Sequence, residues 1–195
     1  MELQLDMGKR YTYADYLTWL DDKRRELIDG FIKMMSPSPR FDHAVVSSNI
    51  AGYLWTVLKK NKGKCRVFTA PFDVRFPKNG ETTDDKIYTV VQPDICVICD
   101  LSKLDELGCC GAPDMIVEIL SPSTTKKDVN DKFNLYEEHG VKEYWVVHPK
   151  DKTVFVFLLQ ENGRYDDGTL YEGAGKAPVH IFENYLIDLN DIFDY

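Results

Sequence analysis

The sequence lacks several features that would point to particular classes of protein. No run approaches 18 apolar residues, so no membrane-spanning helix is predicted. Residues 1–6 carry acids where a secretion signal needs a basic and then an apolar region, so a cleaved signal is not expected. No glycine-rich phosphate-binding motif is present, which argues against a nucleotide-dependent enzyme. The five cysteines are an odd number, a poor disulfide framework that predicts a reducing, cytoplasmic environment.

The length and composition of the chain are those of an ordinary globular protein. The chain has 195 residues, of which 44% are hydrophobic and 12% aromatic. This length and composition allow one domain to bury a core without help from metals or disulfides. No repeat or linker interrupts the sequence. We therefore expect a single domain over residues 1–195, with a core over about 24–160 and a C-terminal extension over 161–195.

The charge argues against one mode of binding and leaves another open. The formal net charge of −8 argues against a protein held on nucleic acid by bulk positive charge. The charge is uneven, however, because residues 21–66 hold ten Lys or Arg against five acids, whereas residues 151–195 hold three against nine. The basic region is either a nucleic-acid-binding patch or a set of solvated lysines at the end of a helix, and charge alone leaves both interpretations open.

The N-terminal third of the chain predicts a short helix, a hairpin and a long helix. Thr12 is a favourable cap for a helix over residues 12–21. The Asp29-Gly30 dipeptide lies between two short apolar runs and predicts a β-hairpin, because it supplies the positive backbone angles of a type I′ turn. Apolar residues then recur at helical spacing over residues 42–60.

The rest of the chain predicts strands and one further helix. Residues 94–98 and 115–120 are apolar runs too short for helices, and they predict central strands covered on both faces. A helix is expected over residues 126–139, because Gly140 is a favourable residue just beyond its end. Further strands are predicted over residues 66–70, 72–76, 144–148 and 154–159. The predicted fold class is α/β, a mixed β-sheet flanked by helices, with an N-terminal helix and a β-hairpin.

Glu118 is the most informative residue, because it places a carboxylate inside an apolar strand. A buried charge is costly unless it is paired or bound to a cation. Asp94 opens the other apolar strand, and if the two strands are neighbours, the two carboxylates would raise a pKa or recruit a divalent metal. Asp114 lies on the same strand as Glu118 at about 13 Å, too far to share an ion. The alternative is a single buried acid satisfied by backbone N–H groups.

Three further residues could join this pair, and each has a structural alternative. Lys132 lies near the inward face of the last predicted helix, where it needs an anionic partner unless it forms a surface pair with Asp128. His43 lies on the inward stripe of the first long helix, as a catalytic residue or as a hydrogen-bonded core residue. Glu26 is directly opposite Lys33 across the predicted hairpin, so a cross-strand ion pair is its alternative.

Two motifs are rejected as sites. Cys96 and Cys99 have the spacing of a metal or redox pair, but on a strand their side chains point to opposite faces and cannot chelate together. Ser121 and Ser123 stand without the Gly-x-Ser-x-Gly elbow of a nucleophile, and their expected role is to turn the chain and cap the next helix. Neither zinc nor a serine nucleophile is therefore expected.

Several short motifs, taken together, resemble a known superfamily of nucleases. They are Arg25-Glu26-Leu27-Ile28-Asp29-Gly30, Met35-Ser36-Pro37, the His43 helix, Ala70-Pro71-Phe72-Asp73-Val74-Arg75, Val91-Gln92-Pro93-Asp94, Ala112-Pro113-Asp114, Val117-Glu118-Ile119-Leu120-Ser121-Pro122-Ser123-Thr124, Lys132 with Tyr136, and Gly140-Val141-Lys142-Glu143-Tyr144-Trp145. They resemble the restriction-endonuclease-like, PD-(D/E)XK superfamily and, within it, a large bacterial family of mostly uncharacterised endonucleases. The resemblance spans about residues 10–150.

This resemblance implies roles for the acids and for a lysine. Asp94 would be the acid of the PD element and Glu118 the acid of the second element, together holding Mg²⁺, or Mn²⁺ as a substitute. The superfamily usually has lysine two residues after the second acid, where this sequence has Leu120. The resemblance points to Lys132, on the following helix, as its replacement.

The resemblance also implies accessory groups and a substrate. Glu26 matches an additional acid near the site and His43 an accessory residue, while a backbone carbonyl near Ile119 is expected to contribute to the metal site. The implied activity is Mg²⁺-dependent hydrolysis of phosphodiester bonds in DNA, in which the ion polarises the phosphate and Lys132 orients the attacking water. No membrane partner is implied, and a homodimer fits the resemblance because related nucleases often pair to cut two strands.

Two alternatives to a DNA endonuclease stay open. A non-catalytic nucleic-acid-binding or regulatory domain would keep the fold and the basic region without metal-dependent turnover. A structural or partner-binding protein would use its acids only in internal ion pairs, and divalent metal would then leave its melting temperature unchanged.

Overall fold

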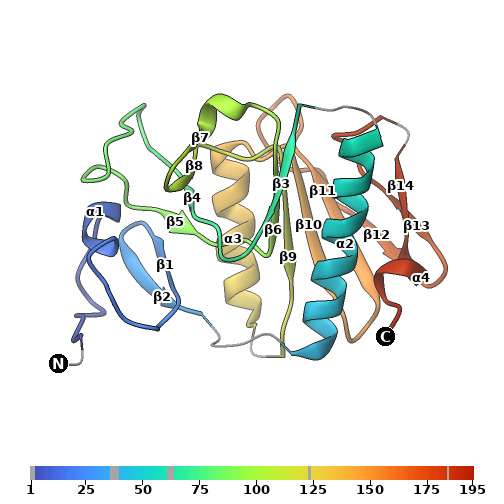
Figure 1. Ribbon diagram of the computed structural model, residues 1–195, viewed down its shortest axis with the longest axis horizontal. Coiled ribbons are helices and arrows are strands. Elements are labelled where there is room, and N and C mark those ends of the chain that lie inside the picture. Colours follow the sequence, from blue (N-terminus) through green and yellow to red (C-terminus); the bar gives the residue numbers. More distant parts are fainter. Residues whose placement is uncertain (1–2, 36–39, 61–63, 123, 184) are drawn as a thin grey trace.

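Two six-stranded sheets lie side by side in the protein (Figure 1). The computed structural model describes residues 3–35, 40–60, 64–122, 124–183 and 185–195. Lys62, Ser123 and the Ser36-Pro37 part of one predicted motif lie outside these residues. In chain order the elements are α1 Tyr13–Tyr16, β1 Arg25–Ile28, β2 Phe31–Met34, α2 Phe41–Lys60, β3 Arg66–Thr69, β4 Val74–Arg75, β5 Val90–Val91, β6 Ile95–Ile98, the 3₁₀ turn η1 Leu101–Lys103, β7 Leu104–Asp105, β8 Gly108–Cys110, β9 Met115–Ile119, α3 Lys126–His139, β10 Glu143–His148, β11 Thr153–Leu158, β12 Thr169–Glu172, β13 Lys176–Pro178, β14 Leu186–Asp188 and α4 Leu189–Ile192.

The central sheet has the strand order β12-β11-β10-β9-β6-β3 and contains both predicted core strands as neighbours. Strand β9 pairs parallel with β10 and antiparallel with β6, and every residue of β6 and β9 is buried. The α/β prediction of a mixed sheet flanked by helices is therefore confirmed. The structure differs in having a second sheet, β2-β1-β5-β4-β8-β7, because β5 pairs with the hairpin strand β1 and β4 pairs with β5, instead of with the central strands.

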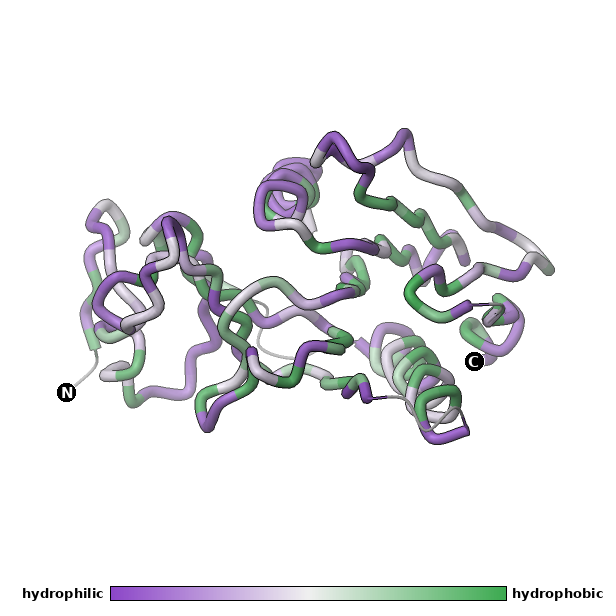
Figure 2. The backbone as a smooth tube through the Cα atoms, turned by 90° about the horizontal axis from the view of Figure 1, so that it is seen from above, coloured by the Kyte–Doolittle hydropathy of each residue, from purple (hydrophilic) through white to green (hydrophobic). Residues whose placement is uncertain are grey.

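The two long helices cover opposite faces of the central sheet, as the view from above shows (Figure 2). Residues of α2 such as Ile50 pack with Met115 and Val117 of β9. Tyr136 of α3 packs with Ile116 in a separate core cluster. Because side chains alternate along a strand, Glu118 points to the same face as Ile116, toward α3.

Helices α2 and α3 agree with the predicted ranges because local signals define their ends. The buried residues of α2 follow one stripe, Val46, Ile50, Leu54, Val57 and Leu58. Helix α3 begins after a capping box formed by Thr125 and Asp128, and Gly140 ends it in the left-handed conformation with φ 80°. Helix α1 is shorter than expected, because the backbone N–H groups of Thr18 and Trp19 donate to carbonyls three residues back and so form tighter turns.

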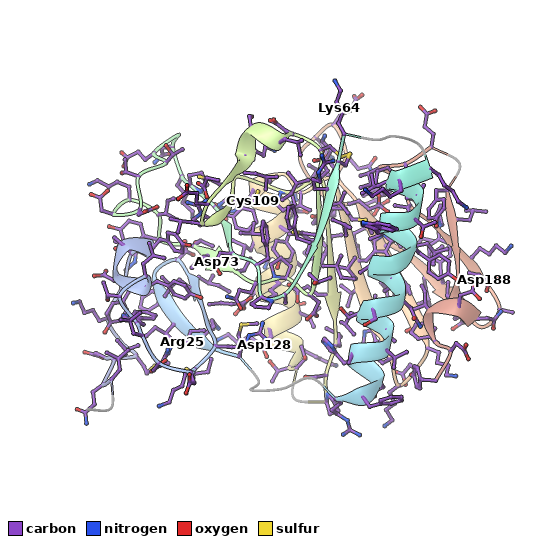
Figure 3. The ribbon with its side chains drawn as sticks, in the orientation of Figure 1. Arg25, Lys64, Asp73, Cys109, Asp128 and Asp188 are labelled. Atoms are coloured by element: carbon purple, nitrogen blue, oxygen red, sulfur yellow. A yellow bond between two sulfur atoms is a disulfide. The ribbon has the colours of Figure 1, made fainter. Side chains whose placement is uncertain are left out.

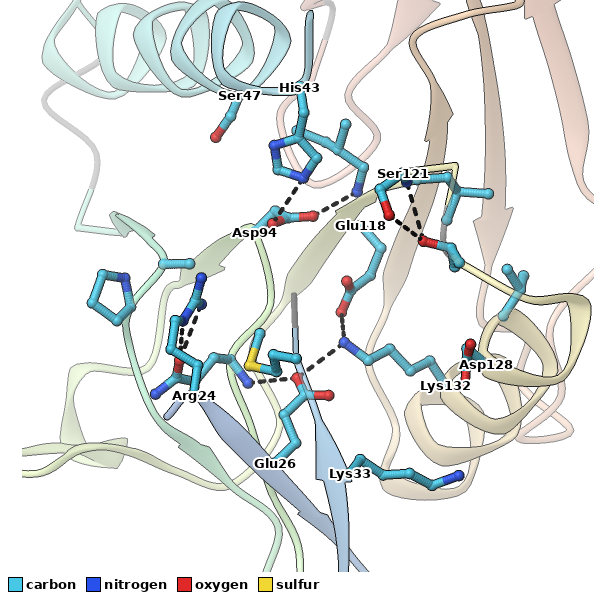
Figure 4. A pocket seen from close by; sticks show the side chains of 18 of the residues that line it. Arg24, Glu26, Lys33, His43, Ser47, Asp94, Glu118, Ser121, Asp128 and Lys132 are labelled. Carbon is cyan, nitrogen blue, oxygen red and sulfur yellow. Dashed lines mark hydrogen bonds and ion pairs between the residues drawn. The ribbon is translucent and has the colours of Figure 1, made fainter. Parts of the chain in front are cut away.

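The predicted hairpin is confirmed, and it brings Glu26 to the central sheet. Asp29 and Gly30 have φ values of 51° and 86°, as a type I′ turn requires. The register places Glu26 opposite Lys33, as expected. The hairpin forms one edge of the second sheet, next to the end of α3 that carries Asp128 and Lys132 (Figure 4).

Cys65 and Cys99 form a disulfide, which the prediction of a poor disulfide framework did not anticipate. The antiparallel pairing of Arg66 with Ile98 places the two cysteines side by side at one end of β3 and β6. This pairing joins residues 34 positions apart, so it could not be read from spacing. Cysteine content consequently no longer supports a reducing compartment, and the cytoplasmic location stays a prediction. Among the described residues, no helix is long and apolar enough to span a bilayer.

The C-terminal segment after residue 160 contributes to the same core. Strand β12 extends the central sheet, and β13 and β14 form a two-stranded sheet beside α2. Asn49 of α2 donates from Nδ2 to the carbonyls of Asp191 and Ile192 in the C-terminal helix α4. This packing places β13, β14 and α4 beside α2, in the core that α2 shares with the central sheet (Figure 1).

Candidate active site

Asp94 and Glu118 come together because β6 and β9 are neighbouring antiparallel strands. The register pairs Ile95 with Val117, so Asp94, just before β6, lies across from Glu118. Oδ2 of Asp94 accepts a 2.7 Å hydrogen bond from the N–H of Ile119. The backbone of β9 therefore fixes the position of the Asp94 carboxylate next to Glu118.

Glu118 is a buried carboxylate whose two oxygens have different surroundings. Oε1 accepts hydrogen bonds from Tyr136 OH at 2.6 Å and from Lys132 Nζ at 2.9 Å. Among the described residues, Oε2 has no hydrogen-bond partner, and Glu118 lines a cleft. Burial raises the pKa of Glu118 to about 7, with Asp94 adding to the rise and Lys132 opposing it.

Lys132 bridges two acids that come from distant parts of the chain. Its Nζ lies 2.9 Å from Oε1 of Glu118 and 3.0 Å from Oε1 of Glu26. Burial alone would lower the pKa of Lys132, but the two carboxylates raise it above its ordinary value. The alternative interpretation of Glu26, an ion pair with Lys33, is not what the structure has, since Lys33 pairs with Asp131 at 3.1 Å.

His43 lies at the start of α2 and contacts Asp94, the other acid of the pair. Its Nε2 is 3.3 Å from Oδ1 of Asp94. Burial lowers the pKa of His43, but the Asp94 carboxylate outweighs that effect and raises it. Among the described residues, Nδ1 of His43 is buried without a hydrogen-bond partner. His43 therefore orients Asp94 from the helix side, opposite the Ile119 N–H.

All six residues that the sequence analysis selected line one cleft of about 830 Å³. Figure 4 shows Glu26, Glu118 and Lys132 pointing toward one another, with Asp94 turned toward His43, between α2, the hairpin and α3. These residues are Glu26, His43, Asp94, Glu118, Ile119 and Lys132. Asp128 also lines the cleft, but its carboxylate caps α3 and does not pair with Lys132.

Sequence reasoning missed the contacts of three residues near these acids, which are Tyr136, Gln92 and Arg24. Tyr136 was part of a motif, but its hydrogen bond to Glu118 was not foreseen. The backbone N–H of Gln92 donates to Oε1 of Glu26 at 2.9 Å, and the Gln92 side chain accepts from Arg24. The position of Gln92 two residues before Asp94 was a possible signal, but its partners are 66 and 68 residues away.

The basic region over residues 21–66 does not form one surface. Arg24, Lys33 and Arg40 line the cleft. Lys59 and Lys60 end the 20-residue helix α2 and lie roughly 25 Å from its first turn. Figure 3 likewise shows Lys64 at the far side of the molecule from Asp128 of the cleft. The charge excess is therefore divided between the cleft and the opposite end of the protein.

The oxygen donors of the cleft suit a hard divalent cation that keeps much of its hydration. Among the described residues, no cluster of three or more His, Cys, Asp or Glu side chains is arranged to hold a metal. Asp94 and Glu118 supply two carboxylates, and Oε2 of Glu118 is free of protein donors within the described part of the chain. Mg²⁺ is commonly bound by one or two carboxylates together with waters and substrate phosphates, so the two residues fit it.

The protein is an α/β protein of the restriction-endonuclease-like class. Its defining features are the mixed central sheet, the two acids at the ends of neighbouring strands and the lysine beside them. The chain belongs to the family Uma2, described as "Putative restriction endonuclease", whose model matches residues 13–186. Membership of this family supports a nuclease function.

Two individual proteins are similar to this chain. The uncharacterized protein slr1290 of Synechocystis sp. is 27% identical over 157 residues, which cover 79% of this chain and 74% of that protein. The crystal structure of "a putative nuclease belonging to DUF820" from Anabaena variabilis superposes with a TM-score of 0.74. It is 22% identical and the match covers 94% of this chain and 98% of that one, so it supports the fold.

Proposed function

We propose that this protein is a metal-dependent endonuclease that hydrolyses phosphodiester bonds in DNA. The observation that carries this proposal is the meeting of Asp94 and Glu118 in a cleft with Lys132 between Glu118 and Glu26. Membership of a restriction endonuclease family supports the reaction class. DNA is proposed as the substrate because the cleft extends from α2 to α3. Arginine and lysine side chains, which can contact backbone phosphates, line it.

Asp94 and Glu118 would hold Mg²⁺ or Mn²⁺, with the carbonyl of Ile119 as the proposed backbone ligand. When bound, the ion would polarise the scissile phosphate and lower the pKa of a bound water. His43 and the Ile119 N–H keep Asp94 oriented from two sides. Tyr136 and Lys132 keep Glu118 oriented through Oε1 and leave Oε2 toward the cleft.

Lys132 is proposed as the catalytic cation in place of the lysine that the superfamily usually has two residues after the second acid. Its ammonium group can donate three hydrogen bonds, and two are used on Glu26 and Glu118. The third can be donated to an attacking water or to a phosphate oxygen as negative charge develops there. Glu26 positions the ammonium group from the hairpin side.

The decisive experiment is cleavage of a labelled DNA duplex with Mg²⁺, with Mn²⁺ and with a chelator. Asp94→Asn and Glu118→Gln should each abolish metal-dependent cleavage while the protein stays folded. Asp114→Asn is the matched control, because Asp114 is an equally buried acid that does not line the cleft. Mn²⁺ should also raise the melting temperature of the parent protein and leave that of Glu118→Gln unchanged.

A non-catalytic nucleic-acid-binding domain is the second candidate function. The observation that favours it is that Arg24, Lys33 and Arg40 line the cleft, whereas Lys132 is paired with Glu118 and Glu26 within the protein. Under this candidate, the duplex would bind without metal-dependent turnover, and Asp94→Asn would not change the affinity. Cleavage that requires Mn²⁺ and is lost in Asp94→Asn would exclude it.

A further inference from the structure

Arg24 is a cation of the cleft whose partners leave part of its hydrogen-bonding capacity unused. Its guanidinium donates from Nε and Nη2 to Oε1 of Gln92, at 3.4 and 3.1 Å. Among the residues that the structure describes, no carboxylate lies within ion-pair distance of it. The two lysines of the cleft, by contrast, are each paired with carboxylates. A half-buried arginine without an acid partner is suited to an anionic ligand.

A series of side-chain hydrogen bonds fixes the orientation of Arg24. Tyr13 OH donates to Oδ2 of Asp73 at 2.9 Å, and Nε2 of Gln92 donates to Oδ1 of Asp73 at 2.9 Å. Because a carboxylate only accepts hydrogen bonds, the amide nitrogen of Gln92 must face Asp73 and its oxygen must face Arg24. One edge of the guanidinium is therefore held in place, and its remaining N–H groups are available to a ligand in the cleft.

The neighbouring Arg25 shows what a structural arginine looks like in this protein. It is 5% exposed, and its two terminal nitrogens each lie 2.6 Å from an oxygen of Asp21. The guanidinium also lies over the ring of Trp19, 5.6 Å from its centroid. Arg25 is thus fully engaged inside the fold, whereas Arg24 lines the cleft.

The position of Arg24 relative to the acids determines which anion it can bind. Figure 4 places Arg24 and Lys132 on opposite sides of Glu26 and Asp94. The same Gln92 that holds Arg24 donates its backbone N–H to Glu26, so the arginine has a fixed position relative to the acidic group. An anion bound by Arg24 would therefore lie beside the acids, on the side away from Lys132.

We propose that Arg24, oriented by Gln92 and Asp73, binds a backbone phosphate adjacent to the scissile one. This subsite rests on the proposed nuclease function and deepens it, because it requires a substrate with at least two successive phosphates. Forked guanidinium donors match phosphate oxygens in two parallel hydrogen bonds. A polynucleotide occupies this subsite, and a single phosphodiester leaves it empty.

The test compares Arg24→Gln with Lys86→Gln, a charge-matched control on an exposed loop outside the cleft lining. Binding of a labelled DNA duplex is measured by fluorescence anisotropy over a series of salt concentrations, with a chelator present to prevent cleavage. Arg24→Gln should weaken binding about tenfold or more and lower the salt slope by about 1. Arg24→Lys keeps the charge without the forked donors, so it should recover the slope and only part of the affinity.

A second measurement compares Mn²⁺-dependent hydrolysis of the duplex with that of bis(p-nitrophenyl) phosphate, which has one phosphodiester. Arg24→Gln should lower kcat/KM for the duplex about tenfold more than for the small substrate. An equal loss on both substrates, or a salt slope equal to that of Lys86→Gln, would overturn the subsite. If the parent protein hydrolyses neither substrate, the proposed function fails, and the salt series still decides whether Arg24 binds phosphate.

Discussion

Asp114, just before strand β9, and Glu118, near its other end, are equally buried carboxylates with different partners. Each is 8% exposed. Both oxygens of Asp114 are occupied, one by the N–H of Cys99 at 2.7 Å and the other by Lys142 at 2.7 Å. Glu118 concentrates its two donors on Oε1 and turns toward a cleft. Burial therefore does not separate the two acids, whereas the distribution of their hydrogen bonds does.

The surroundings of the two ends differ in the same way. Beside Asp114, the Cys65–Cys99 disulfide joins β3 to β6, so that end of the sheet is covalently cross-linked. Beside Glu118, like charges gather, since Asp94 and Glu26 both raise the pKa of Glu118. Asp114 therefore lies among favourable contacts, whereas Glu118 is buried beside two acids that Lys132 offsets only in part, so a further cation there would be favourable.

Replacing the lysine partner of Glu118 or of Asp114 should give the largest difference in cleavage rate between the two ends of β9. Lys132→Met should lower the Mn²⁺-dependent cleavage rate about 10²–10⁴-fold, because the ammonium donor to the attacking water or to the phosphate is lost. Lys142→Met is the matched control, since Lys142 pairs with Asp114 and is 69% exposed. It should keep the cleavage rate of the parent protein.

The two roles of Lys132 can be separated by measuring melting alongside cleavage. If Lys132 is only structural, its loss leaves Glu118 buried and unpaired, at a cost of about 3 kcal/mol of unfolding free energy. Normal cleavage by a folded Lys132→Met protein would reject the catalytic role.

Removal of the disulfide should lower the free energy of unfolding without affecting cleavage in the cleft. The bridge spans 34 positions, and a loop of that length corresponds to about 3–4 kcal/mol of unfolding free energy in the chain-entropy model. Denaturation of the Cys65→Ser/Cys99→Ser double variant measures this loss, with the reduced parent protein as the control. Loss of cleavage by the folded double variant would contradict the separation of the two ends.

Asp114→Asn should lower stability by about 1–3 kcal/mol, because an amide replaces a charged acceptor of two hydrogen bonds. Cleavage should stay at the level of the parent protein, in contrast to Glu118→Gln. Urea denaturation and the duplex assay, run on both variants, measure the two effects. Equal loss of cleavage in the two variants would show that the acids do not differ in function.

The smallest effect concerns the dependence of stability on pH, measured with a chelator present. The pKa of Glu118 is raised from 4.5 to about 7, so the folded protein binds a proton more tightly than the unfolded chain. Its contribution to stability is full below about pH 4.5 and is lost as the pH rises through 7. Glu118→Gln should lack this decline of about 1–3 kcal/mol, and Asp114→Asn should retain it.

Elements defined by neighbouring residues could be predicted from the sequence. The Asp29-Gly30 turn, the end of α3 at Gly140 and the two buried strands all appear where local patterns place them. The resemblance also directed attention to residues that line one cleft. Their catalytic and metal-binding roles stay predictions, since geometry alone does not measure turnover.

Contacts between distant segments could not be predicted in the same way. Lys132 contacts Glu26 across 106 positions, whereas the sequence had suggested Lys33 as the partner of Glu26. The orientation of Arg24 by Gln92 also joins distant segments. Register within a hairpin places two residues side by side, but the path of the whole chain decides which charge is nearest.

The sequence by itself determined that a carboxylate lies on a covered strand, because Glu118 stands within an apolar run whose residues are all buried. Only the tertiary structure decided what surrounds that carboxylate. Glu118 meets Asp94 from β6, Lys132 from α3 and, through Lys132, Glu26 from the hairpin. Local chain preferences act over a few residues, whereas these charges are brought together by the packing of the sheet, α3 and the hairpin.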